Sequence, residues 1–172
     1  MIEAALLDIV PTDPALRLRP ASAADEAFIW HLFDEVRRGQ FAATGLAGPV
    51  LDQIVAQQFK SQTAGYVAQF PDAISLIVTR DTTSVGRLLL HCASERWHVI
   101  DIVLLPADCG RGLGSAIFDA LEASARARGI GALTLTVLAS NLGAHRFYLR
   151  RGFAEIGSAG GAHIAMKKDL AI

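Results

Sequence analysis

The sequence predicts a mixed α/β (α+β) fold, with a central mixed and largely antiparallel sheet and helices on both faces. Strand-like alternation and helix-like spacing of apolar residues follow one another in the order β-α-α-β-β-β-α-β-α-β-β. The length of 172 residues suits one ordinary domain, and 52% hydrophobic residues suffice for a large core. We therefore expect a single domain over residues 1–172, with residues 1–14 as an N-terminal extension.

The first half of the chain is predicted to hold one strand and two helices. Leucines alternate with arginines in the first strand, which is the pattern of a strand buried on one face. Ser22 and Asp25 have the spacing of a capping box at the start of the first helix. Pro49 favours the first turn of the second helix. The predicted bounds are 15–19 for the strand, 22–39 for the first helix and 49–59 for the second.

The second half begins with two apolar, β-branched-rich segments separated by the turn-like residues 81–84, which predicts an antiparallel hairpin. A third apolar segment is stopped by Pro106 and leads into a glycine-rich turn. A helix, a strand, a second helix and two last strands are predicted to follow. The predicted strands are 74–80, 85–92, 97–105, 133–137, 153–157 and 162–168, and the predicted helices are 113–128 and 141–152.

Charge and cysteine content exclude several classes of protein. With 16 Lys and Arg against 17 Asp and Glu, the chain lacks the basic surface that nucleic-acid binding requires. No apolar segment approaches the roughly 20 residues that span a bilayer, and the start has no signal-peptide pattern, so we expect no membrane partner. Two cysteines and five scattered histidines indicate neither a disulfide framework nor a metal site. We therefore expect a reducing, cytoplasmic location.

The turn Cys109–Ser115 has glycines at three alternate positions. Glycine permits close backbone approach, and a helix that begins there directs free N–H groups and a positive dipole end at its ligand, which suits a phosphate. Arg111 adds positive charge, which favours a ligand over a ligand-free tight turn. Ser115 and Ile117 stand where a dinucleotide fingerprint needs glycine, and the chain has no Gly-Lys-Ser/Thr string of a nucleotide-hydrolysing loop.

Two blocks of sequence lie one after the other on the predicted elements. The turn Cys109-Gly-Arg-Gly-Leu-Gly114 follows the pattern Arg/Gln-x-x-Gly-x-Gly/Ala except at its first position. The second pattern, Leu-x-Val-x-x-x-Asn-x-x-Ala-x-x-x-Tyr-x-x-x-Gly-Phe, is matched by Leu135, Val137, Asn141, Ala144, Tyr148, Gly152 and Phe153. Together the blocks resemble the GCN5-related N-acetyltransferase (GNAT) superfamily. The likeness is strongest over residues 101–153 and extends over residues 15–168.

The resemblance implies acetyl-CoA as the co-substrate, with no metal. In that superfamily the amides of the glycine-rich turn hold the pyrophosphate, and the preceding strand pairs its backbone with the pantetheine arm. An Asn beside the cofactor and a Tyr near the thioester sulfur correspond to Asn141 and Tyr148. The implied cofactor-binding residues are Ile102, Val103 and Leu104 on the strand, Gly110, Arg111, Gly112, Leu113, Gly114 and Ser115 on the turn, and Asn141.

Tyr148 and Asn141 also have ordinary structural interpretations. Asn141 has the position of a helix N-cap, and Tyr148 shares a helical face with Ala144, where an aromatic residue is usually part of the core. The second block favours Tyr148 as a catalytic general acid. A phenol with a pKa of about 10 stays protonated at neutral pH and can give its proton to a departing thiolate.

Asp101, His98 and Glu95 are the candidates for the base that takes the amine's proton, since related enzymes often use an acidic residue on this strand or a chain of water molecules. A charged Asp in so apolar a strand is costly unless it has a partner, which favours a role for Asp101. We assign Asp101 as the candidate catalytic base, with structural hydrogen bonding as the alternative. Regular alternation would group Asp101 with Val99 and Val103 and put His98 on the opposite face.

Cys109 departs from the superfamily pattern, which has Arg or Gln at this position. This departure puts the affinity for the cofactor in question. A thiol beside Arg111 and a helix start would be a candidate for a lowered pKa. No partner base is adjacent in sequence, however, so we do not expect a catalytic cysteine.

The sequence therefore predicts an acetyl-CoA-dependent N-acyltransferase that acts by direct attack on the thioester. The expected acceptor is a primary amine of a small molecule, amino acid or peptide. A non-catalytic acyl-CoA-binding sensor is one alternative, and a structural interaction domain, which leaves the glycine-rich turn unexplained, is another. No motif identifies the acceptor, which the superfamily binds mainly with the first two helices, here residues 28–59, and the last strands. Homodimer formation is left open.

Overall fold

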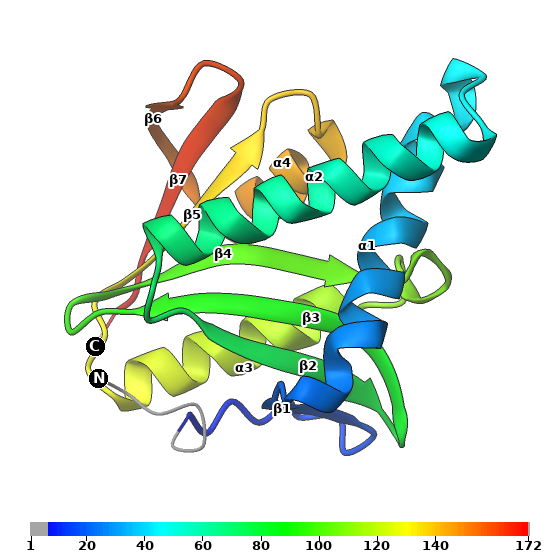
Figure 1. Ribbon diagram of the computed structural model, residues 1–172. Helices are drawn as coiled ribbons and strands as arrows, with labels where there is room; N and C mark the ends of the chain where they lie inside the picture. Colours follow the sequence, from blue (N-terminus) through cyan, green and yellow to red (C-terminus); the bar gives the residue numbers. More distant parts are fainter. Residues whose placement is uncertain (1–6, 172) are drawn as a thin grey trace.

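The computed structural model describes residues 7–171 and folds them around one sheet (Figure 1). The order of strands and helices is the predicted one. The strands are β1 (Leu16–Pro20), β2 (Ile74–Arg80), β3 (Thr83–Cys92), β4 (Arg96–Leu104), β5 (Ala132–Leu138), β6 (Ala154–Ala159) and β7 (His163–Asp169). The helices are α1 (Glu26–Phe41), α2 (Gly48–Gln69), α3 (Leu113–Ala127) and α4 (Leu142–Arg150). Short 3₁₀ turns lie at Ala23–Asp25, Ala42–Thr44 and Pro106–Asp108.

The seven strands form one sheet in the order β1-β2-β3-β4-β5-β7-β6. Neighbouring strands are antiparallel except β4 and β5, which are parallel. Helices α1 and α2 cover one face of the sheet, and α3 and α4 lie behind the other (Figure 1). The predicted fold class, a mixed and largely antiparallel sheet with helices on both faces, is confirmed.

The larger apolar core lies between the sheet and the helices α3 and α4. Its fully buried side chains include Leu88, Leu90, Trp97, Ile117, Phe118, Leu121 and Leu133. A second apolar layer faces α1 and α2, where Leu32, Val55 and Ile77 are each no more than 2% exposed. Leu7 and Ile9, from the predicted N-terminal extension, are buried in the larger core, and residues 1–6 of that extension lie outside the described residues.

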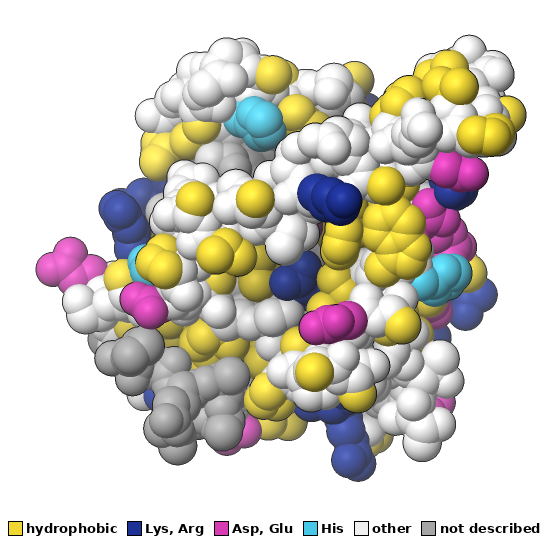
Figure 2. All heavy atoms as spheres, in the orientation of Figure 1, with side chains coloured by type: hydrophobic (Ala, Val, Ile, Leu, Met, Phe, Trp, Pro, Cys, Tyr) yellow, Lys and Arg dark blue, Asp and Glu magenta, His cyan; other side chains and the backbone are white. Residues whose placement is uncertain are grey.

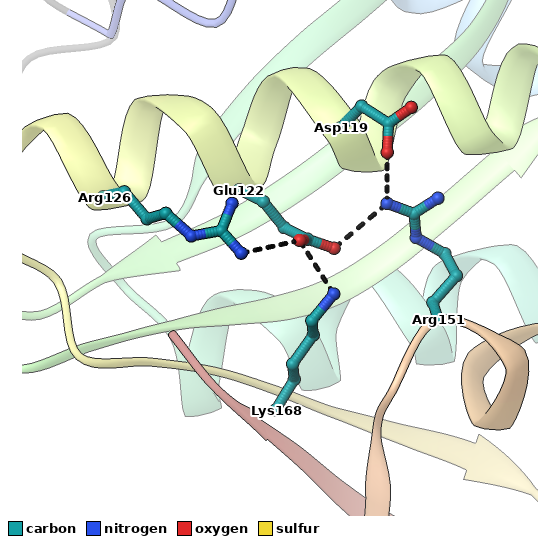
Figure 3. A network of polar contacts seen from close by, with 5 residues as sticks. All are labelled: Asp119, Glu122, Arg126, Arg151 and Lys168. Carbon is teal, nitrogen blue, oxygen red and sulfur yellow. Dashed lines mark hydrogen bonds and ion pairs between the residues drawn. The ribbon is translucent and has the colours of Figure 1, made fainter. Parts of the chain in front are cut away.

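A buried ionic network joins α3 to β7 and to the end of α4 (Figure 3). Glu122 on α3 is 5% exposed. Its carboxylate accepts hydrogen bonds at 3.2, 3.0 and 2.8 Å from Arg126, Arg151 and Lys168. Arg151 also donates to Asp119 at 2.6 Å. Burial raises the pKa of Glu122, but the hydrogen bonds from Lys168 and Arg151 outweigh burial and leave the pKa below its usual range.

Helix α2 is longer than predicted, because it ends at Gln69 and not at Phe59. Its second part is rich in small and polar residues, so the apolar spacing that marks an amphipathic helix stops early. Ala and Gln nevertheless favour helical backbone, and the helix continues. Within residues 7–171, none of the helices combines the length and apolar character needed to cross a bilayer.

Candidate active site

A β-bulge in β4 decides which face of the sheet carries Asp101. On the neighbouring strand β3, Leu90 pairs with Val99. The adjacent residue Leu89 pairs with Asp101, so Ile100 is an extra residue between the two pairs. Such a bulge reverses the alternation of the side chains beyond it. Val99 therefore lies in the larger core, whereas Asp101 faces α1 and α2.

His98 lies on the same face as Asp101, so the prediction that alternation separates these two residues is wrong. The His98 ring stacks on Phe70, just after α2, with centroids 5.4 Å apart, and its Nδ1 lies 2.9 Å from Oγ1 of Thr134. Burial, the largest cause, lowers the pKa of His98 to about 4. A ring that binds protons so weakly is a poor base near neutral pH. Glu95, the third candidate, is exposed in the turn before β4, at the opposite end of the strand from the glycine-rich turn.

Asp101, Tyr66, Arg87 and Arg37 form a polar group between the sheet and the helices α1 and α2, here called the Asp101 cluster. The Tyr66 hydroxyl on α2 and the Asp101 carboxylate each affect the pKa of the other. Arg87 on β3 and Arg37 on α1 attract that carboxylate electrostatically. Burial nevertheless raises the pKa of Asp101 above its usual range. A carboxylate with a raised pKa is a better proton acceptor near neutral pH than an ordinary one.

Strands β4 and β5 separate along their length. The parallel ladder joins only residues 96–99 of β4 to residues 132–135 of β5. Beyond this ladder, β4 continues to Leu104 beside β3. The N–H and C=O groups on the β5 side belong to Ile102 and Leu104, because Leu105 donates to the Val85 carbonyl and the alternate residue Val103 also bonds toward β3. Ile102 and Leu104 are therefore free of sheet partners on this side in the described chain. Both are among the residues that the resemblance assigns to a pantetheine arm.

The glycine-rich turn follows the end of β4 and opens α3. Gly110 and Gly112 have φ values of 73° and 79°, in the left-handed region that favours glycine. Gly112 is the N-cap of α3 and no side chain caps the helix, so the N–H groups of residues 113–115 have no intrahelical acceptor. A Cβ atom added at Gly110 or Gly112 would meet nothing within 4 Å. With Arg111 exposed beside it, the turn presents amides and positive charge to open space.

Asn141 caps a helix, as its position in the sequence allows. It is the N-cap of α4, and its Oδ1 accepts a hydrogen bond from the Ala144 amide at 3.1 Å. Asn141 also borders a hollow of about 350 Å³ that Gln40, Leu138 and Ser140 line with it. The hollow therefore lies between the end of α1 and the end of β5.

Tyr148 packs on the core side of the sheet and is 8% exposed. The rings of Phe147, Phe118 and Phe153 lie edge-on to it at centroid distances of 5.4, 5.6 and 5.8 Å. Its hydroxyl makes no hydrogen bond to any of residues 7–171. Burial raises the pKa of Tyr148 to about 12, and Asp101 adds to the rise. The two candidate catalytic side chains thus interact electrostatically although they come from opposite sides of the sheet.

Comparison with known proteins identifies the family. Residues 33–153 match the acetyltransferase (GNAT) family. The chain belongs to this family. No curated protein matches the sequence.

Solved structures show that the GNAT fold extends over most of the chain. PaiA N-acetyltransferase from Thermoplasma acidophilum, in complex with coenzyme A, has a TM-score of 0.69 at 17% identity, covering 90% of this chain and 98% of that chain. An acetyltransferase from Thermus thermophilus has a TM-score of 0.65 at 20% identity, with 91% and 97% coverage. A GNAT family acetyltransferase from Elizabethkingia anophelis with acetyl-CoA bound has a TM-score of 0.60 at 13% identity, with 92% and 100% coverage.

Cys109 is not an activated thiol in this GNAT chain. Burial and the nearby Asp108 raise the pKa of its thiol, the opposite of what a nucleophilic cysteine needs. Its sulfur lies 3.5 Å from the Leu105 carbonyl oxygen. Burial also raises the pKa of Cys92, to about 11, and both cysteines are free thiols. Within residues 7–171, no group of three or more His, Cys, Asp and Glu side chains is arranged to hold a metal ion.

Two members of the Asp101 cluster, Tyr66 and Arg87, were not predicted from the sequence. Tyr66 lies beyond the predicted end of its helix, in the part of α2 without apolar spacing. Arg87 is a charged residue in an apolar strand. The same signal drew attention to Asp101, and it could also have identified Arg87. Neither residue belongs to the two blocks that carry the family resemblance.

Proposed function

We propose that this GNAT protein transfers the acetyl group of acetyl-CoA to a primary amine of a small molecule, amino acid or peptide. The observation that carries the proposal is the electrostatic effect of Asp101, on the strand with the unpaired edge, on the pKa of Tyr148. One is a carboxylate with a raised pKa, and the other is a phenol whose hydroxyl has no partner in the described chain. Direct attack by an amine on a thioester needs one proton acceptor and one proton donor.

The residues at the end of β4 fit acetyl-CoA. The free amides at the start of α3 suit a diphosphate, because helix N-termini bind anions, and Arg111 adds charge there. The unpaired backbone groups of Ile102 and Leu104 suit the amide groups of a pantetheine arm. Asn141 borders the hollow at the end of β5. Bound along these residues, acetyl-CoA supplies the thioester that the amine attacks.

Asp101 and Tyr148 then have complementary roles. Asp101 accepts the proton that the amine must lose to expose its lone pair, and the raised pKa of Asp101 makes it a stronger acceptor. Tyr148 donates its hydroxyl proton to the departing sulfur, so that the thiol leaves in its neutral form. With a pKa of about 12, Tyr148 keeps this proton at neutral pH until the sulfur needs it. A cytoplasmic location belongs to the same proposal, because Cys92 and Cys109 are free thiols, as a reducing compartment requires.

Two measurements test the proposal against its alternatives. Titration calorimetry with acetyl-CoA measures binding, and a thiol-reactive dye measures CoA release in the presence of a broad panel of amines. We expect binding, together with amine-dependent release of thiol. Binding without release from any amine identifies an acyl-CoA sensor. No binding at all identifies a structural interaction domain.

A pair of glycine variants tests the donor site. Gly112→Val should weaken acetyl-CoA at least about tenfold, because a side chain strains the left-handed backbone and fills the space above the amides. Gly160→Val is the matched control, since Gly160 also has a positive φ, of 63°, but lies in the turn between β6 and β7. Equal affinities in the two variants, with both proteins folded, would exclude the glycine-rich turn as the donor site.

A further inference from the structure

Arg87 is a half-buried arginine without an acidic partner. Its Nε donates to Oγ of Ser75 at 2.9 Å, and its two Nη groups make no hydrogen bond to residues 7–171. No carboxylate of those residues forms an ion pair with it. Burial lowers the pKa of Arg87 in spite of the opposing effects of Asp101 and Tyr66. Because a charge removed from water is costly unless it is paired, this guanidinium is suited to an anionic ligand.

Two other arginines of the protein, Arg38 and Arg19, have carboxylate partners although water can solvate them. Arg38 on α1 has a side chain that is 39% exposed, and it still bonds to Asp34 at 2.8 Å and to Asp52 at 2.7 Å. Arg19, with a side chain that is 44% exposed, bonds to Asp25 at 2.6 Å. Arg87 is more enclosed than either and has only a neutral serine hydroxyl.

Arg37 gives the Asp101 cluster a second positive charge. Its guanidinium donates to Oε1 of Gln40 at 2.9 Å and lies 5.1 Å from the ring centroid of Phe33, so its contacts are also neutral. The cluster therefore contains two guanidinium groups and one carboxylate. Figure 2 shows basic atoms in the gap between α1 and α2, above β3 and β4, where a ligand can reach them.

The spacing along the sheet sets the size of that ligand. Asp101 pairs with Leu89, and Val103 pairs with Arg87. Arg87 therefore lies on the same face of the sheet as Asp101, on the neighbouring strand and two residues away from the partner of Asp101. Two residues of an antiparallel strand span about 7 Å. An amine held at Asp101 and an anion held at Arg87 are therefore separated by only a few bonds. Arginine is the side chain best suited to the planar anion of a carboxylate.

We propose that the acceptor is a free amino acid whose carboxylate is bound by the Nη groups of Arg87. Arg37 contributes positive potential to the same position, and Asp101 receives the proton of the amine. The inference rests on the proposed function, because it names the substrate class of that acceptor site. It makes Arg87 a specificity-determining residue.

The first test compares each standard amino acid that has a primary α-amine with its own carboxamide as acceptor. We expect kcat/KM to be about 10- to 100-fold higher for the acids, the value of a charge-assisted bidentate contact. Amidation makes the amine less basic and so leaves more of it unprotonated for attack. Without carboxylate recognition the amides would therefore be the better acceptors, and amides that equal or exceed their acids would overturn the inference.

Variants then assign the preference to Arg87. Arg87→Gln should raise KM for the amino acid and reduce the acid-over-amide preference to within about threefold, with the KM for acetyl-CoA unchanged. Arg87→Lys, which keeps the charge and loses the planar fork, should retain an intermediate preference. Arg38→Gln is the control, because Arg38 has its own carboxylates, and it should keep the full preference. An undiminished preference in Arg87→Gln, or an equal loss in Arg38→Gln, contradicts the inference.

A binding measurement separates this inference from the proposed function. N-acetyl amino acids carry the carboxylate but no reactive amine, so their stabilisation of the protein, measured as a shift in Tm with CoA present, needs no turnover. We expect a shift for the wild type and for Arg38→Gln, and none for Arg87→Gln. If no amine is acetylated, the proposed function fails. The Arg87-dependent shift in Tm still tests whether Arg87 binds a carboxylate. An absent shift in the wild type, or an equal one in all three proteins, overturns the carboxylate site.

Discussion

Asp101 and Glu122 are two carboxylates that folding encloses on opposite faces of one sheet, and their surroundings differ. Glu122 receives hydrogen bonds from Lys168, Arg151 and Arg126, and these contacts hold its pKa below the usual range in spite of burial. Asp101 forms no ion pair within residues 7–171, and burial raises its pKa. The ionised form of the carboxylate is therefore stabilised at Glu122 and destabilised at Asp101.

The difference separates a structural site from the proposed reactive one. Nearby cations favour the ionised form of Glu122, so it is a poor proton acceptor near neutral pH. Its contacts hold α3 against β7 and the end of α4. A carboxylate with distant cations keeps its affinity for protons, and the cations keep their affinity for anions.

Asp101→Asn should have the largest effect. It keeps the size of the side chain and removes the proton acceptor, so kcat should fall by about 10²- to 10⁴-fold. The wild-type rate should fall as the pH drops below the raised pKa of Asp101, because the base is then protonated, and the variant should lack this limb of the pH profile. Glu122→Gln is the matched control and should keep a near-normal kcat. A wild-type rate and profile in Asp101→Asn would make Asp101 a structural residue.

Tyr148→Phe should also lower kcat, by about 10²- to 10⁴-fold, because it keeps the ring and removes only the donor hydroxyl. Tm and acetyl-CoA affinity should change little, since the hydroxyl has no hydrogen-bond partner in the described chain. Phe153→Leu disturbs the same aromatic group and leaves the hydroxyl in place, so it should lower Tm and spare kcat. A kcat for Tyr148→Phe within about threefold of wild type would show that Tyr148 only fills the core.

Glu122→Gln should lower the free energy of unfolding by about 3 kcal/mol, because it leaves buried cations without their counter-charge. Chemical denaturation measures the change. Glu155→Gln is the control, since its ion pair with His145 is exposed on the Glu155 side, and it should cost less than about 1 kcal/mol. Equal losses in the two variants would mean that the Glu122 network adds no more than a surface pair.

The pH dependence of stability should have opposite signs for the two carboxylates. The folded pKa of Glu122 is below its ordinary value of 4.5, so its stabilisation is present above that value and is lost as the pH falls through the folded pKa. The folded pKa of Asp101 is above its ordinary value of 3.8, so its favourable contribution is present at lower pH and is lost as the pH rises through the folded pKa.

At pH 7, Asp101→Asn should therefore be more stable than the wild type, because it removes a charge that burial disfavours, and Glu122→Gln should be less stable. Both differences should shrink in acid, and Tm measured from about pH 3 to pH 7 follows them. A lower Tm for Asp101→Asn at pH 7 would indicate that the ionised carboxylate stabilises the fold.

Local sequence patterns are sufficient to predict the order of the elements and the motifs at their ends. Apolar periodicity, capping residues and glycines that require a left-handed backbone are properties of consecutive residues, so the hairpin, α3 and its glycine-rich turn are visible in the chain itself. The same holds for Tyr148 and Asn141, which stand seven positions apart on one helix. The end of α2 was missed because small and polar residues continue a helix without marking a face.

The surroundings of Asp101 depend on contacts between elements that are distant in the sequence. The bulge at Ile100 is a feature of the pairing between β3 and β4, and it turns Asp101 toward α1 and α2, against the alternation of its own strand. Arg37, Tyr66 and Arg87 then meet it from three other elements, and the separation of β4 from β5 leaves the edge beside it unpaired. Burial and charge pairing depend on neighbours that folding brings together, and these neighbours make Glu122 a structural ion-pair centre and Asp101 the proposed base.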